Sequence, residues 1–261
     1  MGFIDVIKER AKANKKTIVL PETEDRRTYE AAAQILKEGI ANIVLVGSEE
    51  AVKKGSEGLD ISGAVVVDPA TSDKTQGYID KLVELRQKKG MTPEQAKEIL
   101  LNQYLYYGVM MVKMGDADGM VSGACHSTAD TLRPCLQILK TKPGTKLVSA
   151  FFLMVVPNCE YGANGTFIFA DSGLNQNPNP EELAAIAGSS AESFKLLVQE
   201  EPVVAMLSHS TKGSAKHADV DKVVEATRIA KESYPDLKLD GEFQLGAAIV
   251  SSVGPSKAPS S

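Results

Sequence analysis

Short apolar segments alternate with amphipathic helical segments along most of this 261-residue chain. The alternation is typical of α/β proteins, in which parallel strands are joined by helices that cover both faces of a sheet. The apolar segments of strand length are 17–20, 42–46, 64–67, 119–121, 146–156, 166–169 and 203–207. The segments with helical spacing of apolar residues are 3–13, 28–37, 48–55, 78–89, 93–114, 181–197 and 219–232.

Local signals predict where several of these helices begin and end. Gly39 follows the last apolar residue of one helix, which suits a left-handed C-cap. Ser48 precedes another helix as an N-cap. Thr92 and Gln95 have the spacing of a capping box.

The apolar run 146–156 suggests how the chain is divided. A run with so few polar residues predicts a strand that is buried on both faces. Because it follows Gly144, we predict one α/β domain over 1–145 and a second over 146–261. The final segment, SSVGPSKAPSS, is rich in Ser and Pro and is predicted to be flexible.

The stretch 116–134, DADGMVSGACHSTADTLRP, carries the strongest functional signal. A short strand leads into small residues, and Ser127 and Thr128 then open a helix. Free backbone N–H groups at such a helix start bind anions, and Arg133 adds a planar cation suited to phosphate or carboxylate. An ordinary helix start with Ser127 as N-cap has the same pattern. The residues alone leave both interpretations open.

Three further polar loops follow predicted strands, namely 21–27, 170–180 and 208–216. Ligands of open α/β sheets bind at the carboxyl ends of the strands, so these loops are candidate ligand contacts. The last loop places a Ser-Thr pair beside Lys212, although Ser, Thr and Gly also form ordinary turns. The sequence contains no HExxH motif, Walker loop or GxSxG elbow, and its histidines are scattered. No metal centre is therefore predicted.

Three single residues are weaker candidates. Arg86 continues the apolar stripe of its helix and either enters a cleft or, as we favour, packs its stem with its head in water. Cys159 lacks a neighbouring His or helix start, so a passive thiol is favoured over a nucleophile. His126 is either a base or a packed or capping residue.

Charge and composition exclude several classes of function. A net charge of −5, 5% aromatic residues and no Trp argue against nucleic-acid binding. The N-terminus lacks the apolar segment of a signal peptide, and no apolar run is long enough to span a membrane. Three cysteines without CxxC spacing suit reduced thiols, so we predict a cytoplasmic protein.

Taken together, the loops resemble those of the phosphate acetyltransferases. The matching runs cover nearly the whole chain: VLPETEDRR, SGACHSTADTLRP followed by LQILKTKPGTK, FADSGLNQNPNPEELAAIA, and LSHSTKGSAKHADVDKVVEA. The resemblance implies two three-layer α/β domains with mainly parallel sheets and a cleft between them, as in the isocitrate and isopropylmalate dehydrogenases. It also implies a homodimer.

The resemblance implies an activity and a set of site residues. Family members transfer an acetyl group reversibly between coenzyme A (acetyl-CoA) and inorganic phosphate, giving acetyl phosphate, with no metal in the chemical step. Ser127, Thr128 and Arg133 then correspond to a site for phosphate or acetyl phosphate. Arg86 and Arg133 resemble the arginines used toward anionic ligands, coenzyme A included. Cys159 resembles a cysteine near the active site that is not the nucleophile.

The resemblance also implies a direct mechanism. The coenzyme A thiol, deprotonated by an aspartate, attacks the carbonyl of acetyl phosphate, and arginine and serine donors stabilise the oxyanion. The Ser-Arg-Gly segment and the Asp that supply these groups in the family follow the position of Ser261. No catalytic residue is therefore assigned within this chain.

The sequence departs from the family pattern near its end. Gly246 replaces an Asp, Ser251 and Ser252 replace a Pro-Glu pair, and His209 replaces an aromatic residue. We therefore expect a C-terminally truncated chain with an incomplete second domain, inactive by itself. Alternatives are an acyltransferase of the phosphate butyryltransferase type and a non-catalytic chain that binds phosphate or coenzyme A. A metal-dependent dehydrogenase is a distant third, since paired metal-binding aspartates are not evident.

Overall fold

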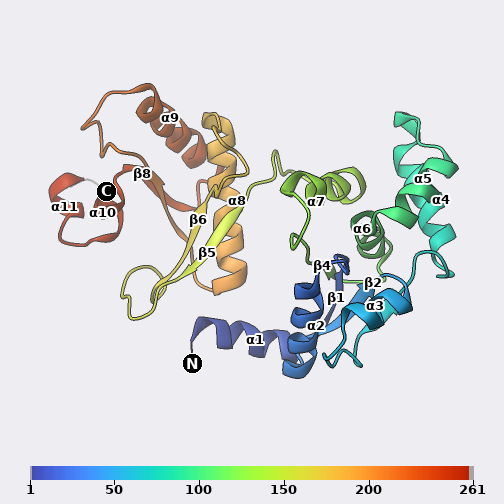
Figure 1. Ribbon diagram of the computed structural model, residues 1–261. Coiled ribbons are helices and arrows are strands. Elements are labelled where there is room, and N and C mark those ends of the chain that lie inside the picture. Colours follow the sequence, from blue (N-terminus) through green and yellow to red (C-terminus); the bar gives the residue numbers. More distant parts are fainter. Residues whose placement is uncertain (1, 259–261) are drawn as a thin grey trace. The chain divides into compact units, whose positions relative to one another are not determined.

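A computed structural model describes residues 2–258 and divides the chain between Lys140 and Thr141 into two compact units. Each unit has its own strands and its own apolar core (Figure 1). All strand pairs in the described chain are parallel except one. The predicted α/β fold with mainly parallel sheets is confirmed.

The first unit is built on a four-stranded parallel sheet with strand order β3-β2-β1-β4. Neighbouring residues of β1 face opposite sides: Val19 packs with Tyr78 and Tyr107 in one cluster, and Leu20 packs with Tyr29 in another. Helices therefore cover both faces of this sheet. Its elements are α1 (Phe3–Ala13), β1 (Lys16–Leu20), α2 (Arg26–Glu38), β2 (Ala41–Val46), α3 (Glu49–Gly55), β3 (Val65–Val67), α4 (Thr75–Arg86), η1 (Gln87–Lys89), α5 (Pro93–Asn102), α6 (Tyr104–Met114), β4 (Gly119–Met120), α7 (Thr128–Pro134) and η2 (Cys135–Leu139).

The predicted helix caps of the first unit are confirmed. Gly39 adopts the left-handed conformation after α2, and Ser48 accepts a hydrogen bond from the Ala51 N–H at the start of α3. Thr92 forms a reciprocal capping box with Gln95.

The single helix predicted over 93–114 is wrong. The backbone leaves the helical region at Gln103, with φ −125° and ψ 90°, and this separates α5 from α6. The change of direction lets α6 enter the core, where most of its residues are buried. A Cβ on Gly108 of α6 would lie 2.8 Å from the Met120 Sδ, so glycine permits the close approach of this helix to β4.

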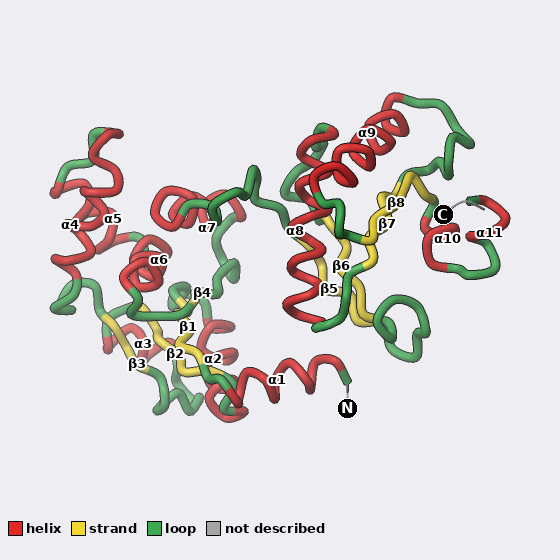
Figure 2. The backbone as a smooth tube through the Cα atoms, turned by 180° about the vertical axis from the view of Figure 1, so that it is seen from behind, coloured by secondary structure: helices red, strands yellow, loops and turns green. Residues whose placement is uncertain are grey.

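The second unit contains a hairpin and a separate parallel pair of strands. Strands β5 and β6 are antiparallel, and β7 pairs with β8 in parallel. Helices α8 and α9 lie beside the strands of this unit (Figure 2). Met206 of β7 and Leu239 of β8 pack with alanines of both helices in one core. The elements are β5 (Phe151–Val155), β6 (Thr166–Ala170), α8 (Pro180–Val198), β7 (Val203–Leu207), α9 (Ala218–Ser233), β8 (Lys238–Phe243), α10 (Leu245–Ile249) and α11 (Gly254–Lys257).

The long buried strand predicted over 146–156 is wrong. Only Phe151–Val155 forms a strand, and within residues 2–258 it pairs with β6 alone. A two-stranded hairpin leaves much of each strand open, and Phe152 is accordingly 60% exposed. The flexible tail predicted from Ser251 contains α11, and its last three residues lie outside the described chain. Among the residues described, no helix combines the length and apolar character needed to cross a membrane.

Candidate functional site

Two of the predicted ligand loops meet at one edge of the first sheet. Strand β4 lies parallel to β1, with Ile18 opposite Gly119 and Val19 opposite Met120. The loops that follow these two strands, 21–25 and 121–127, therefore leave the sheet side by side at its carboxyl edge.

Glu22 connects these loops. Its Oε2 accepts hydrogen bonds from the backbone N–H groups of Gly123 at 2.6 Å and Ala124 at 2.7 Å. Its Oε1 accepts from the N–H groups of Cys125 at 3.1 Å and His126 at 3.0 Å. The residue is only 2% exposed. Burial by itself would raise the pKa of this carboxyl, but the backbone donors and His126 outweigh it and lower the pKa to about 2.

The backbone N–H groups of the small-residue loop before α7 are occupied, whereas the prediction concerned the N–H groups at the helix start. Four consecutive N–H groups of the loop form an anion-binding concavity, and Glu22 of the same chain fills it. Glu22 is not among the candidate residues predicted from the sequence. One sequence signal points to this contact. Glu22 is an acidic residue that follows one strand of a parallel sheet, and a loop of small residues follows the neighbouring strand.

Helix α7 follows this loop and carries three of the four predicted substrate-binding residues. Ser127 is the N-cap, as predicted: its Oγ accepts from the Asp130 N–H and donates to the Asp130 Oδ2 at 2.6 Å. Thr128 is the exposed first residue of the helix. Arg133 is exposed and lies 3.6 Å from Asp130. Arg133 is five positions after Thr128, which corresponds to a rotation of about 140° around the helix axis.

The two predicted arginines both act electrostatically on one tyrosine. Tyr106 of α6 is buried, and its hydroxyl donates to the Gln137 Oε1 at 3.1 Å. Burial raises the pKa of Tyr106, and the positive charges of Arg133 and Arg86 oppose this change. Arg86 ends α4, and its buried Nε has no hydrogen-bond partner. Ser127 and Thr128 lie at the other end of α7.

The loop 208–216 of the second unit has structural partners of its own. Ser210 is fully buried and donates to the Glu242 Oε1 at 2.9 Å. The Lys212 Nζ contacts the Asp240 carboxylate at 2.9 and 3.0 Å. The hydroxyl and cation predicted as ligand contacts thus serve to attach this loop to β8.

The loop 170–180 is also stabilised internally. The Asp171 carboxylate accepts from the N–H groups of Ala150, Gly173 and Leu174. Burial would raise the pKa of Asp171, but the Asn175 side chain and these donors lower it. Cys159 is partly buried. A Cβ on Gly246 would meet no atom within 4 Å, so packing does not require a glycine at this position.

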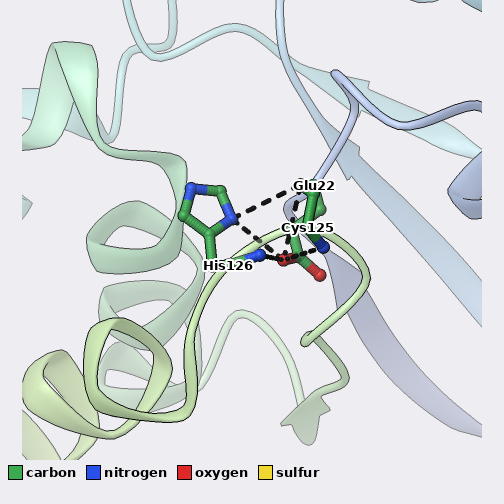
Figure 3. Close-up of side chains that lie close together, drawn as sticks. All are labelled: Glu22, Cys125 and His126. Atoms are coloured by element: carbon green, nitrogen blue, oxygen red, sulfur yellow. Dashed lines mark hydrogen bonds and ion pairs between the residues drawn. The ribbon is translucent and has the colours of Figure 1, made fainter.

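The prediction that the chain lacks clustered metal-ligating residues needs correction. Glu22, Cys125 and His126 come together at the edge of the first sheet (Figure 3). Burial, together with the charges of Glu24 and Glu22, raises the pKa of Cys125 to about 12. The His126 ring lies between two carboxylates, with its Nδ1 2.9 Å from the Glu22 Oε1 and its Nε2 3.5 Å from the Glu24 Oε1.

Parallel strands with polar loops at their carboxyl edge define an α/β protein of the class that binds its ligands at that edge. A sequence model of the family described as phosphate acetyl/butaryl transferase matches residues 2–261. The chain belongs to this family and is an acyltransferase. The family uses coenzyme A as a substrate.

Individual relatives agree with this assignment. The chain is 55% identical over its full length to a phosphate acetyltransferase of Acetivibrio thermocellus, of which it covers 78%. It is 56% identical to a phosphate acetyltransferase of Thermoanaerobacterium thermosaccharolyticum, of which it covers 79%. The crystal structure of a phosphotransacetylase from Streptococcus pyogenes matches 99% of this chain and 77% of its own, with a TM-score of 0.89 and 42% identity. The catalytic segment expected after Ser261 stays a prediction.

Proposed function

We propose that this chain serves the reversible transfer of an acetyl group between coenzyme A and inorganic phosphate. Acetyl-CoA and phosphate give acetyl phosphate and coenzyme A. The proposal rests on the likeness to phosphate acetyltransferases over the whole chain. The domain division at 145/146, drawn from the apolar run 146–156, and a homodimeric assembly, which rests on the family resemblance, belong to the same proposal.

The observation that carries the proposed site is the buried Arg86 Nε without a hydrogen-bond partner, and the positive charges of Arg86 and Arg133 both act on Tyr106. A buried guanidinium nitrogen without a partner, as at the Arg86 Nε, is costly unless a ligand pairs with it. Coenzyme A and acetyl phosphate both carry phosphates, which arginine binds through paired N–H donors. We assign Arg86 and Arg133 to one anionic group of the substrates.

Ser127 and Thr128 complete the proposed site at the other end of α7. Their hydroxyls are exposed next to the carboxyl edge of the sheet. The rotation between Thr128 and Arg133 favours two separate anionic subsites over one shared anion. This suits a reaction with two anionic substrates, since holding both in a fixed orientation supplies much of the rate of a direct transfer.

Ligand binding tests this assignment without requiring turnover. We expect Arg86→Gln and Arg133→Gln each to weaken binding of coenzyme A or acetyl phosphate by about 10- to 150-fold in titration calorimetry, from a lost interaction of ~1.5–3 kcal/mol. Arg228→Gln is the matched control, because Arg228 lies on α9 and pairs there with Glu225 and Glu232. Unchanged affinity for both ligands in both site variants would rule out the assigned subsite.

A longer acyl group is the alternative substrate, because the family description includes both acetyl and butaryl transfer. The relatives more than half identical to this chain are phosphate acetyltransferases, which favours acetyl. Competition between acetyl phosphate and butyryl phosphate for the wild-type chain decides between them. Tighter binding of butyryl phosphate would replace the acetyl assignment with the butyryl one.

A further inference from the structure

The side chains of Glu22, Cys125 and His126 form a cluster that the proposed acetyl transfer does not use. The His126 Nδ1 lies 2.9 Å from the Glu22 Oε1. The Cys125 Sγ lies 3.6 Å from the same oxygen and 3.5 Å from the His126 Nδ1. The three atoms thus form a small triangle of one oxygen, one nitrogen and one sulfur (Figure 3).

This triangle has nearly the size of one face of a tetrahedral zinc site. Zn–S bonds of about 2.3 Å and Zn–N or Zn–O bonds of about 2.0–2.1 Å place ligand atoms roughly 3.3–3.6 Å apart. The two distances that involve sulfur, 3.5 and 3.6 Å, already agree with this spacing. The nitrogen–oxygen distance needs to open by only about 0.4 Å.

The surroundings hold each ligand in place. Four backbone N–H groups orient the Glu22 carboxylate, so this ligand does not depend on the thiol or the imidazole for its position. On the far side of the ring, the Glu24 Oε1 lies 3.5 Å from the His126 Nε2. A carboxylate behind a metal-binding histidine fixes the ring and makes the other nitrogen more basic.

Thiolate, imidazole and carboxylate together select the kind of cation. Sulfur and nitrogen ligands favour Zn²⁺ over Mg²⁺ and Ca²⁺, which prefer oxygen. One thiolate and one carboxylate balance the charge of a divalent ion. Access is open, because Cys125 is exposed and the His126 side chain is 35% exposed.

We propose that Glu22, Cys125 and His126 bind one thiophilic divalent cation of the Zn²⁺ type, with water as the fourth ligand. The cation takes the place of the protons through which the thiol and the imidazole now contact the Glu22 Oε1. Binding therefore releases the thiol proton to the solvent and leaves the imidazole N–H on Nε2, where it faces Glu24, while the four backbone N–H groups continue to hold the carboxylate.

Titration of the untagged 261-residue chain with Co²⁺ and with Zn²⁺ tests the site. We expect one equivalent of Co²⁺ to give a sulfur-to-cobalt charge-transfer band, and Zn²⁺ to displace it. Cys125→Ser should abolish the band, while Cys135→Ser and Cys159→Ser, the matched controls, should retain it. His126→Gln should weaken Zn²⁺ affinity by more than tenfold, and Glu24→Gln, which changes only the group behind the ring, by about tenfold.

Several results would overturn the proposal. They are the absence of a band in the wild type, a band that survives in Cys125→Ser, and equal Zn²⁺ affinity in the Cys125→Ser and Cys135→Ser chains. Because Cys125 is exposed, its replacement should leave the circular dichroism spectrum unchanged, so loss of binding would not reflect loss of the fold. We leave Glu22 intact in this experiment because its carboxylate holds the loop together.

Discussion

Replacing Glu22 by Gln removes the negative charge that holds two loops of the first unit together. The carboxylate accepts one pair of backbone N–H groups at each oxygen. Glutamine has nearly the same shape but keeps only one acceptor oxygen, and its NH₂ group faces the other pair. Two partly buried N–H donors of the loop are then left without an acceptor. Each such donor costs about 1–3 kcal/mol.

The pKa of Glu22 gives an independent estimate of the same effect. Folding lowers this pKa from 4.5 to about 2, and each pKa unit corresponds to about 1.36 kcal/mol, so the charged group contributes about 3 kcal/mol. A lowered pKa means that this stabilisation is fully present above about pH 4.5 and is lost as the pH falls toward 2. The Glu22→Gln chain should therefore be about 3 kcal/mol less stable in this region at pH 7 and should lose no further stability from this site in acid.

The sharpest assay is amide hydrogen exchange of the folded chain, followed in the segment 122–127. A loss of about 3 kcal/mol should speed exchange of the four N–H groups roughly 100-fold at pH 7, since 1.4 kcal/mol corresponds to a factor of ten. Glu24→Gln is the control, because that side chain is 52% exposed and contacts His126 through the opposite ring nitrogen. Exchange in Glu22→Gln that matches the wild type would refute the assigned role of the carboxylate.

The remaining predictions concern stability. Gly108→Ala should lower the unfolding free energy by about 1–3 kcal/mol in urea titrations, because its new Cβ lies too close to the neighbouring strands. The control is Gly77→Ala, whose Cβ meets no atom within 4 Å. It should raise the unfolding free energy by about 0.5–1 kcal/mol. Thr92→Ala removes the capping box of α5 and should cost about 1 kcal/mol in the same titrations, and no change would contradict the cap. Ser210→Ala removes a hydrogen-bond donor from buried Glu242. Amide exchange in β8 should report a loss of about 1–3 kcal/mol of local stability. Unchanged exchange would contradict the role of Ser210 in attaching its loop to β8.

The parts of the fold that could be predicted are those determined by neighbours in the sequence. Continuous apolar runs indicated the strands of the first sheet, and the structure explains why: Val19 and Leu20 are adjacent yet enter separate cores on opposite faces. The caps at Ser48 and Thr92 depend on contacts only three residues apart and were found for the same reason. The N-cap at Ser127 is another such contact.

The missed features depend on partners far along the chain. Strand β8 was not anticipated because Lys238 and Asp240 interrupt its apolar pattern, and its pairing with β7 gives it order. Glu22 contacts N–H groups 101 to 104 residues away, so no local pattern specifies the bond. The break at Gln103 follows from burial of α6 in the core, which is a property of the assembled unit.

The position of Glu22 decides where a substrate anion can bind in the first unit. A second anion about 4 Å from this carboxylate would meet a repulsion of ~4 kcal/mol at an effective dielectric constant of 20. The Glu22 charge therefore disfavours phosphate at the loop 123–126, and Arg86 and Arg133 become the favoured anion site. A cation bound by Glu22 and the Cys125 thiolate would cancel this charge. If both proposals hold, Zn²⁺ should tighten phosphate binding in the wild type and leave it unchanged in Cys125→Ser.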